Sequence, residues 1–341
     1  MYCCPECFGD RTLRNDIFPL RSTRAGTCPS CASEGRLLLE AKELASYFDL
    51  LVSAYRPSAD GKLLVELFRE DWGIFERFAP EDPLPSKLLS EIIEDPAVIK
   101  ENFVPAFAPD RDQLGEWEKL RDELRYRNRF FPKTDIDHDR LGEWFPLLTL
   151  FPSEIPRIWF RSRIQGGTTR FTIGEMGAPP RELASHGRAN PAGIPYLYLA
   201  SSALTAISET RPHTGELACV AEFELEQELE LIDLRSPSRT ASPFFLEAPE
   251  AIGALRSDLP FLERLGDELT RPILPRSAAF DYTPSQYLCE FIKSLEYDGV
   301  AYRSSVGEGM NLALFDPTRA QCRKLRHFTV DRVHVEASEQ A

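Results

Sequence analysis

Residues 187–209 read GRANPAGIPYLYLASSALTAISE, and this stretch decides how the second half of the chain is interpreted. Its polar, turn-rich beginning, GRANPAGIP, predicts a loop. The apolar run YLYL that follows predicts a strand, and the small-residue segment SALTAISE predicts a short helix. A loop, a strand and a helix are therefore expected to follow one another directly.

Three side chains of this stretch can take part in chemistry: Arg188 in the loop, Tyr198 in the strand and Glu209 at the end of the helix. Taken alone, each has a more ordinary interpretation, as a loop arginine, a sheet aromatic and a helix-end acid. Their order and spacing gain meaning only together with the rest of the chain.

Strand-like runs continue on both sides of this stretch, at residues 158–160, 219–234, 299–302, 312–315 and 328–335. A helix is predicted among them, with Thr283 as its N-cap, Pro284 at its first position and Gln286 completing a capping box. The second half is therefore expected to be α+β with many strands.

The first half has helical periodicity instead. Apolar residues recur at helical spacing between Leu37 and Tyr55, a second helix is expected after Ser86, and a third between Leu114 and Leu124. Residues 152–156 are rich in proline and are taken as the linker. The chain is thus expected to be α+β, with a zinc-binding module, a helical domain and a C-terminal domain at residues 1–35, 36–150 and 155–335.

Two Cys-x-x-Cys pairs lie near the N-terminus, Cys4 with Cys7 and Cys28 with Cys31. Four thiolates close a tetrahedral zinc site without an open coordination position, so the expected zinc is structural. Cys3 is an alternative ligand in place of Cys4. A nucleic-acid-binding zinc ribbon is the competing interpretation, because the segment also carries Arg11, Arg14, Arg21 and Arg24.

The formal net charge of −14 argues against binding along a nucleic-acid backbone, which needs a basic surface. No apolar run is long enough for a membrane span, and the N-terminus lacks the pattern of a signal peptide. A cytoplasmic protein without membrane attachment is therefore expected. The net charge does not exclude an anionic small molecule, which could bind in an arginine-lined pocket.

The ordered motifs of the second half resemble the RES family, over about residues 155–330. The family pattern is a Gly-Arg-x-Asn-x-x-Gly turn, a strand with a tyrosine, and a small-residue helix ending in glutamate. This chain has Arg188, Asn190, Gly193, Tyr198 and Glu209 in that order. It then has GVAYRS at residues 299–304 and GMNLALF at residues 309–315, and Arg161 matches the arginine of the family's first strand.

Two positions depart from the family pattern. An aromatic residue commonly follows the turn arginine, where this chain has Ala189, and the serine strand usually reads Tyr-Pro-Ser, where this chain has Tyr302, Arg303, Ser304 and Ser305. Ser304 aligns best with the family serine, and Ser305 remains an alternative.

The resemblance implies an ADP-ribosyltransferase-like fold, in which two small sheets hold NAD+ in a cleft, and an activity that degrades NAD+. The catalytic set would be Arg188, Tyr198, Glu209 and Ser304. Arginine would bind the pyrophosphate, the carboxylate would stabilise an oxocarbenium-like state, and the tyrosine and serine would hold the nicotinamide. Arg161, Asn190 and Asn311 would contact the substrate.

Several functional alternatives stay open at this stage. The acceptor is either water, as in an NAD+ glycohydrolase, or inorganic phosphate as a co-substrate, as in an NAD+ phosphorylase. The expected role is a toxin or defence effector with an antitoxin or regulatory protein as partner, and the oligomeric state is left open. The other hypotheses are an ADP-ribosyltransferase acting on a macromolecule, where Ile207 occupies the place of a second acid, and a non-catalytic NAD+-binding module.

The first half resembles more loosely the HEPN-like region that precedes some RES domains and begins with paired Cys-x-x-Cys motifs. Many HEPN domains are ribonucleases that use an arginine and a histidine a few residues apart. The helical region has His138, but the nearest upstream arginine, Arg129, lies too far away. The ribonuclease interpretation is therefore weak.

Overall fold

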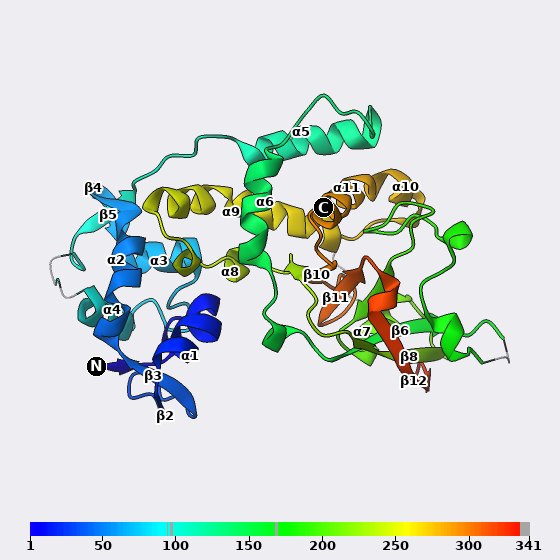
Figure 1. The fold of residues 1–341 in the computed structure, drawn as a ribbon, viewed down its shortest axis with the longest axis horizontal. Coiled ribbons are helices and arrows are strands. Elements are labelled where there is room, and N and C mark those ends of the chain that lie inside the picture. The colour runs from blue at the N-terminus through cyan, green and yellow to red at the C-terminus, as the bar shows by residue number, and fades with distance from the viewer. Residues whose placement is uncertain (94, 96–97, 168–169, 335–341) are drawn as a thin grey trace. The chain divides into compact units, whose positions relative to one another are not determined.

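The computed structural model describes residues 1–93, 95, 98–167 and 170–334, and Figure 1 shows their fold. The chain divides into two compact units, each assembled from separate segments. Unit 1 comprises Met1–Trp117, Ile136–Leu148 and Ser236–Glu263, and unit 2 comprises Glu118–Asp135, Thr149–Arg235 and the chain from Arg264 onward. None of the described helices is long and apolar enough to cross a bilayer.

Unit 2 is built on a mixed seven-stranded sheet with the strand order β12-β8-β6-β7-β11-β10-β9. Its strands are β6 (Ile158–Ile164), β7 (Leu197–Ala200), β8 (Leu217–Leu225), β9 (Leu231–Asp233), β10 (Gly299–Arg303), β11 (Met310–Leu314) and β12 (Ala320–Thr329). Neighbouring strands are antiparallel, except for the parallel pair β9 and β10. The predicted mixture of helices and strands is confirmed.

Among the neighbouring strands of this sheet, β6 and β7 have the fewest paired residues. Only Phe160 and Ala200 are paired there, whereas β6 pairs with β8 along its whole length. The guanidinium of Arg161 donates to the carbonyl oxygen of Tyr198 at 3.1 Å, so a side chain bridges the two strands beyond their one paired position. The structure therefore has one continuous sheet with a weak joint, and the two-sheet arrangement of an ADP-ribosyltransferase stays a prediction.

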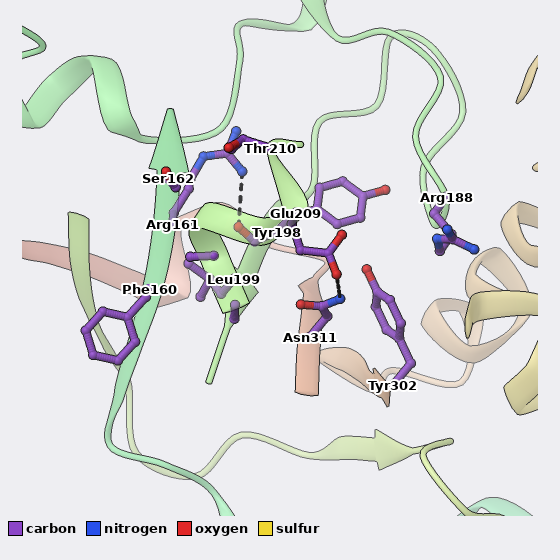
Figure 2. A pocket seen from close by; sticks show the side chains of 12 residues that line it. Phe160, Arg161, Ser162, Arg188, Tyr198, Leu199, Glu209, Thr210, Tyr302 and Asn311 are labelled. Atoms are coloured by element: carbon purple, nitrogen blue, oxygen red, sulfur yellow. Dashed lines mark hydrogen bonds between the residues drawn. The ribbon is translucent and has the colours of Figure 1, made fainter. Parts of the chain in front are cut away.

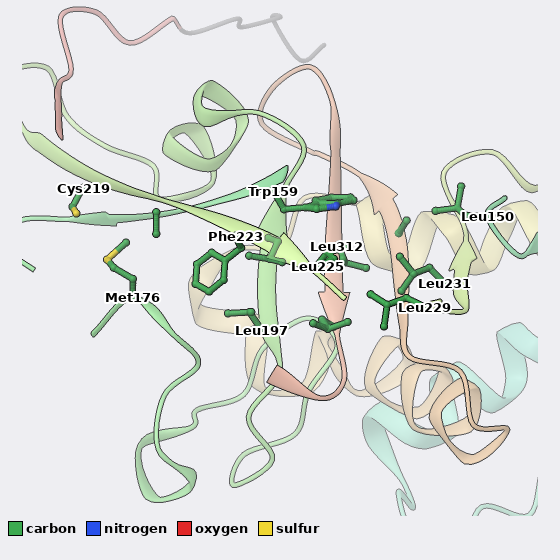
Figure 3. Packing of buried hydrophobic residues seen from close by; sticks show 14 residues of the cluster. Leu150, Trp159, Met176, Leu197, Cys219, Phe223, Leu225, Leu229, Leu231 and Leu312 are labelled. Atoms are coloured by element: carbon green, nitrogen blue, oxygen red, sulfur yellow. The ribbon is translucent and has the colours of Figure 1, made fainter. Parts of the chain in front are cut away.

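One face of the sheet carries the hydrophobic core of unit 2. Figure 3 shows Trp159, Leu197, Phe223, Leu231 and Leu312 packed together from five different strands. Because side chains alternate between the two faces of a strand, the residues next to these core positions face the other side. Short helices of unit 2 are α7 (Ala203–Glu209), α10 (Ala278–Asp281) and α11 (Thr283–Ser294).

The N-terminal part of unit 1 is a small cysteine-containing knuckle. A three-stranded sheet with the order β1-β3-β2 holds it together, formed by β1 (Tyr2–Cys3), β2 (Arg24–Gly26) and β3 (Arg36–Glu40). A π-helical turn (Leu13–Ile17) and α1 (Phe18–Arg21) connect the first two strands, and Phe8 packs on Phe18, Phe48 and Phe75. Aromatic packing thus ties the knuckle to the helices that follow.

The rest of unit 1 is largely helical. It contains α2 (Ala45–Ser53), α3 (Leu64–Trp72), α4 (Leu84–Ile93), α6 (His138–Leu148) and α8 (Pro237–Thr240), with a two-stranded sheet of β4 (Tyr55–Leu63) and β5 (Asn102–Pro105). Two longer helices, α5 (Gln113–Tyr126) and α9 (Pro249–Thr270), contribute residues to both units. The predicted three-domain partition stays a prediction, since the compact units combine segments distant in the sequence.

Three sequence-based expectations about elements were wrong in detail. The helix expected between Leu37 and Tyr55 is shorter, a 3-10 turn at Ala41–Leu44 followed by α2, because Leu37 pairs in β3 and Tyr55 begins β4. The last strand was expected at residues 328–335, but β12 covers Ala320–Thr329, since it pairs along the whole of β8, and residue 335 lies outside the described residues. The side chain of Gln286 donates to two backbone carbonyls of the 187–190 turn, and no capping box is formed.

Candidate functional site

A cavity of about 260 Å³ opens beside the weak joint of the sheet in unit 2 (Figure 2). It is lined by Phe160, Arg161, Ser162, Arg188, Tyr198, Leu199, Ala200, Ala206, Glu209, Thr210, Tyr302 and Asn311. Five residues predicted from the sequence are therefore brought together, namely Arg161, Arg188, Tyr198, Glu209 and Asn311.

Strand alternation explains how three of these side chains reach the same face. Leu197 and Leu199 point into the core, so Tyr198 between them faces the opposite side. The same holds for Asn311 beside Leu312 in β11. Tyr302 of β10 is the direct cross-strand neighbour of Asn311. The sheet register, set by the core residues, therefore aligns the polar side of the cavity.

Glu209 is the last residue of α7, a helix whose N-terminus is capped by the hydroxyl of Ser202. Its carboxylate oxygen Oε1 accepts hydrogen bonds from Ser304 Oγ at 2.7 Å and from Asn311 Nδ2 at 2.6 Å. A carboxylate at the C-terminus of a helix faces the negative end of the dipole, and these two donors offset that cost. Among the described residues Oε2 accepts no hydrogen bond, so one oxygen is left for a ligand.

This contact distinguishes Ser304 from Ser305, the two serines that the sequence left as alternatives. Ser304 donates to Glu209, whereas the described structure gives Ser305 no hydrogen bond to that carboxylate. Ser304 lies just beyond β10 and does not itself line the cavity. It reaches the site through Glu209.

The turn that carries Arg188 is built around the hydroxyl of Tyr198. This hydroxyl accepts from the backbone amides of Ala189 and Asn190, at 2.9 and 3.2 Å, and donates to Asn190 Oδ1 at 2.7 Å. A Cβ atom at Gly187 would lie 2.2 Å from that same oxygen and 2.5 Å from the hydroxyl, so only glycine fits there. Burial raises the pKa of Tyr198, which keeps the phenol protonated at neutral pH.

Asn190 was expected to contact the substrate, but it does not line the cavity. Its side chain is 4% exposed, and its amide nitrogen donates to the carbonyls of Ser185, Pro191 and Ile194. The geometry therefore gives Asn190 a role in shaping the turn.

Two guanidinium groups border the cavity on opposite sides of Glu209 in the view of Figure 2. Arg188 Nη1 donates to the carbonyl oxygen of Arg271 at 2.8 Å. Burial and the neighbouring Arg163 lower the pKa of Arg161 to about 10, so it remains a cation at neutral pH. Its Nε is buried without a hydrogen-bond partner in the described structure. Neither arginine forms an ion pair with a described carboxylate, which favours an anionic ligand.

Tyr302 was not predicted as a site residue, although it belongs to the family motif at residues 299–304. Tyr302 is 5% exposed, and its ring borders the cavity next to Asn311. Burial, reinforced by Tyr198, raises the pKa of its hydroxyl, so it is a neutral donor at physiological pH. The alternation of β10, with Ala301 in the core, was the signal that could have identified it.

The four cysteines predicted to bind metal also come together, in unit 1. The sulfur atoms of Cys4, Cys7, Cys28 and Cys31 all lie within 4.8 Å of one another. The separations are 4.0 Å from Cys4 to Cys7, 3.5 Å from Cys4 to Cys31 and 3.7 Å from Cys7 to Cys28. Tetrahedral coordination at a Zn–S distance of about 2.3 Å requires sulfur separations of about 3.8 Å, so this cluster could hold a zinc ion.

Cys3 is not part of this cluster. Its sulfur donates to the carbonyl oxygen of Leu39 at 3.7 Å, and burial raises the pKa of its thiol. Within the cluster the hydrogen bond between the Cys4 and Cys7 sulfur atoms lowers the pKa of Cys4.

The fold and the cavity define an α+β protein with a pocket beside the joint between β6 and β7. One acid and two arginines line this pocket, and the arginines form no ion pair within the described structure. The RES domain model matches residues 157–332, more than half of the chain, and the chain belongs to the RES domain family. The comparison with curated proteins gives no match.

A structural likeness is found to the crystal structure of the M. tuberculosis MbcT-MbcA toxin-antitoxin complex. The sequence identity is 16%, and the likeness covers 55% of this chain and 92% of that chain, with a TM-score of 0.31.

Proposed function

We propose that this RES-family chain degrades NAD+ by cleaving the bond between nicotinamide and its ribose. One observation carries the proposal: the carboxylate of Glu209 and the guanidinium groups of Arg161 and Arg188 line the same cavity. NAD+ has the matching charges, because its pyrophosphate is anionic and its ribose develops positive charge as the glycosidic bond breaks. The activity itself is the one that the family resemblance implies.

Glu209 would stabilise the reacting ribose. As the C1–N bond breaks, its electron pair leaves with nicotinamide, and the ribose becomes oxocarbenium-like. The donors Ser304 and Asn311 hold Oε1 and so fix the carboxylate, while Oε2, which accepts no hydrogen bond among the described residues, is left to face the ribose. An acceptor oxygen then bonds to C1 and releases its proton. Water would give ADP-ribose and phosphate would give ADP-ribose 1″-phosphate.

The other residues of the cavity would bind the nicotinamide and the pyrophosphate, which lie on either side of the reacting ribose of NAD+. At about 260 Å³ the cavity is smaller than the roughly 300–1,000 Å³ that encloses a whole drug-sized ligand. We therefore infer that it takes the nicotinamide ribose, with the pyrophosphate at the arginines. The rings of Tyr198 and Tyr302 offer stacking surfaces for nicotinamide.

A toxin or defence role, with an antitoxin or regulatory protein as partner, belongs to the same proposal and follows from the family resemblance. The structural zinc at the cysteine cluster and the HEPN-like character of residues 36–150 are proposed on the same terms. The proposed zinc would hold the knuckle together, since the cluster has no open position.

The test uses the purified full chain with NAD+, with and without inorganic phosphate, and resolves the products by mass spectrometry. Glu209→Gln is expected to lower kcat by about 100-fold to 1,000-fold, the usual cost of losing one stabilising group for transition-state charge. Glu182→Gln, an exposed acid outside the cavity, is the matched control and should leave kcat unchanged.

The outcomes separate the hypotheses. Phosphate-dependent loss of NAD+ would identify a phosphorylase, and phosphate-independent loss would identify a hydrolase. Label from NAD+ on a protein or nucleic acid would instead favour the transferase. Tight NAD+ binding without turnover would favour the binding module, and full activity of Glu209→Gln would contradict the role given to this acid.

A further inference from the structure

A fully buried carboxylate lies at the end of α9, close to the turn of Arg188. Glu268 is 0% exposed and forms ion pairs with three arginines of unit 2. The distances are 2.6 Å from Oε1 to Arg121 Nε, 2.7 Å from Oε1 to Arg264 Nη2 and 3.0 Å from Oε2 to Arg271 Nε. The cavity mechanism uses none of these four residues.

Arg271 connects this cluster to the site. It directly follows α9, and its backbone carbonyl oxygen accepts the 2.8 Å hydrogen bond from Arg188. Its side chain is held by Glu268 and by the carbonyl oxygen of Asp281, the latter at 2.9 Å. Fixing the Arg271 side chain on both sides orients its carbonyl toward Arg188. The C-terminal end of a helix also attracts a cation.

Two arginines of this network lie outside the span that matches the RES family. Arg121 and Arg125 belong to α5, whereas the match begins at residue 157. Arg121 pairs with Glu268, and Arg125 pairs with Asp281, whose backbone carbonyl holds Arg271. Two consecutive turns of α5 therefore support the residue that holds Arg188.

Stability alone is a poor explanation for this cluster. Ion pairs taken out of water contribute little to stability compared with apolar residues of the same shape, because desolvation offsets the attraction. What a rigid set of charges does fix is geometry. Arg271 also donates a hydrogen bond from Nε to Oε2, whereas Arg121 and Arg264 approach Oε1 as ion pairs without hydrogen-bond geometry.

We propose that Arg121 and Glu268 are positioning residues for Arg188, so that the C-terminal half of α5 is part of the NAD+-binding apparatus. The inference rests on the proposed function, in which Arg188 binds the pyrophosphate. It assigns to a segment outside the family match an effect on substrate affinity that is transmitted through Glu268, Arg271 and Arg188.

The test compares Arg121→Ala with the unmodified full chain in NAD+ turnover. KM for NAD+ is expected to rise about tenfold, with kcat changed less than about twofold, since Arg188 remains present but is held less well. A merely structural loss would reduce the active fraction, and therefore kcat, without raising KM. Arg157→Ala removes an exposed ion pair with Glu224 in the same unit and is the control.

A second comparison tests whether Arg121 acts through Arg188. In an Arg188→Ala background, Arg121→Ala is expected to cause no further rise in KM, because the group it positions is gone. Additive effects would overturn the inference. Calorimetric titration of NAD+ into the Glu209→Gln chain, with and without Arg121→Ala, should show the same tenfold weakening without turnover.

Folding and the proposed function are controlled separately. If circular dichroism shows that Arg121→Ala is unfolded, Glu268→Gln, which conserves side-chain volume, takes its place with the same expected rise in KM. No NAD+ loss by the unmodified chain would refute the proposed function. Normal turnover by the unmodified chain with an unchanged KM in the folded variant would refute only this inference.

Discussion

At the scale of single residues, Tyr198 illustrates how one atom can organise a site. Its hydroxyl serves two backbone amides and one side-chain amide, and all three belong to the turn that carries Arg188. Its ring meanwhile lines the cavity. Shape and function therefore depend on the same side chain.

Tyr198→Phe is expected to destabilise the chain by about 1–3 kcal/mol, because the amides of Ala189 and Asn190 lose their acceptor in a buried turn. KM for NAD+ should rise as well, since Arg188 sits in that turn. Thermal unfolding and turnover measure the two effects.

Tyr196→Phe is the matched control for this change. The Tyr196 hydroxyl is buried without a hydrogen-bond partner among the described residues, so its removal should be neutral or stabilising. Equal melting temperatures for Tyr198→Phe and the unmodified chain would contradict the role of the Tyr198 hydroxyl.

At the scale of elements, hydrogen bonds hold α7 and the residues just before it against the segment that connects β10 and β11. Thr205 Oγ1 donates to the carbonyl oxygen of Glu308 at 2.6 Å, and the amide of Met310 donates to Ser201 Oγ at 3.0 Å. Gly309 lies between these contacts with φ +104°. These hydrogen bonds bring the end of the helix, which carries Glu209, to the loop that carries Ser304.

Gly309→Ala is expected to lower stability by about 1–2 kcal/mol through its positive φ alone. Its Cβ would also lie 2.7 Å from Ser201 Oγ, so the loop must shift and kcat should fall as Ser304 leaves Glu209. Gly307→Ala is the control, because its Cβ would meet only Ser208 at 3.6 Å. Similar kcat values for both variants would contradict the claim that these hydrogen bonds hold Ser304 beside Glu209.

At the scale of the whole molecule, the sheet of unit 2 and the knuckle of unit 1 differ in the size of their strands and of their apolar core. Unit 2 has a broad sheet and a continuous apolar core, whereas the knuckle of unit 1 has strands of only two to five residues. Segments this short rarely fold without a crosslink or a metal. The cysteine cluster supplies the place for one.

Cys7→Ser, or treatment with a strong chelator, is expected to release one bound zinc per chain and to unfold the knuckle, because the binding free energy of a structural zinc is folding free energy. Elemental analysis measures the metal, and far-ultraviolet circular dichroism measures the structure. Cys3→Ser should retain the zinc, since Cys3 lies outside the cluster. A metal-free chain with unchanged melting would rule out a structural zinc.

Local sequence predicted several elements closely. The strands β7, β10 and β11 appear where short apolar runs stand between turn residues, and α5 appears where apolar residues recur at helical spacing. The helices α3, α6 and α9 were not predicted. Two of them contain an internal proline, Pro146 in α6 and Pro260 in α9, which weakens a helical pattern.

The sequence by itself determined the order of the motifs, the RES family membership, the two cysteine pairs and the acid and arginines of the site. Each motif and each cysteine pair is visible because it consists of residues near one another in the chain, and the order of the motifs can be read along the sequence. Only the tertiary structure decided that Ser304 contacts Glu209, that Asn190 shapes a turn, that Tyr302 lines the cavity and that Arg121 of α5 forms an ion pair with Glu268. Such contacts join distant segments, and they arise from strand register and the packing of separate elements, which no local pattern encodes.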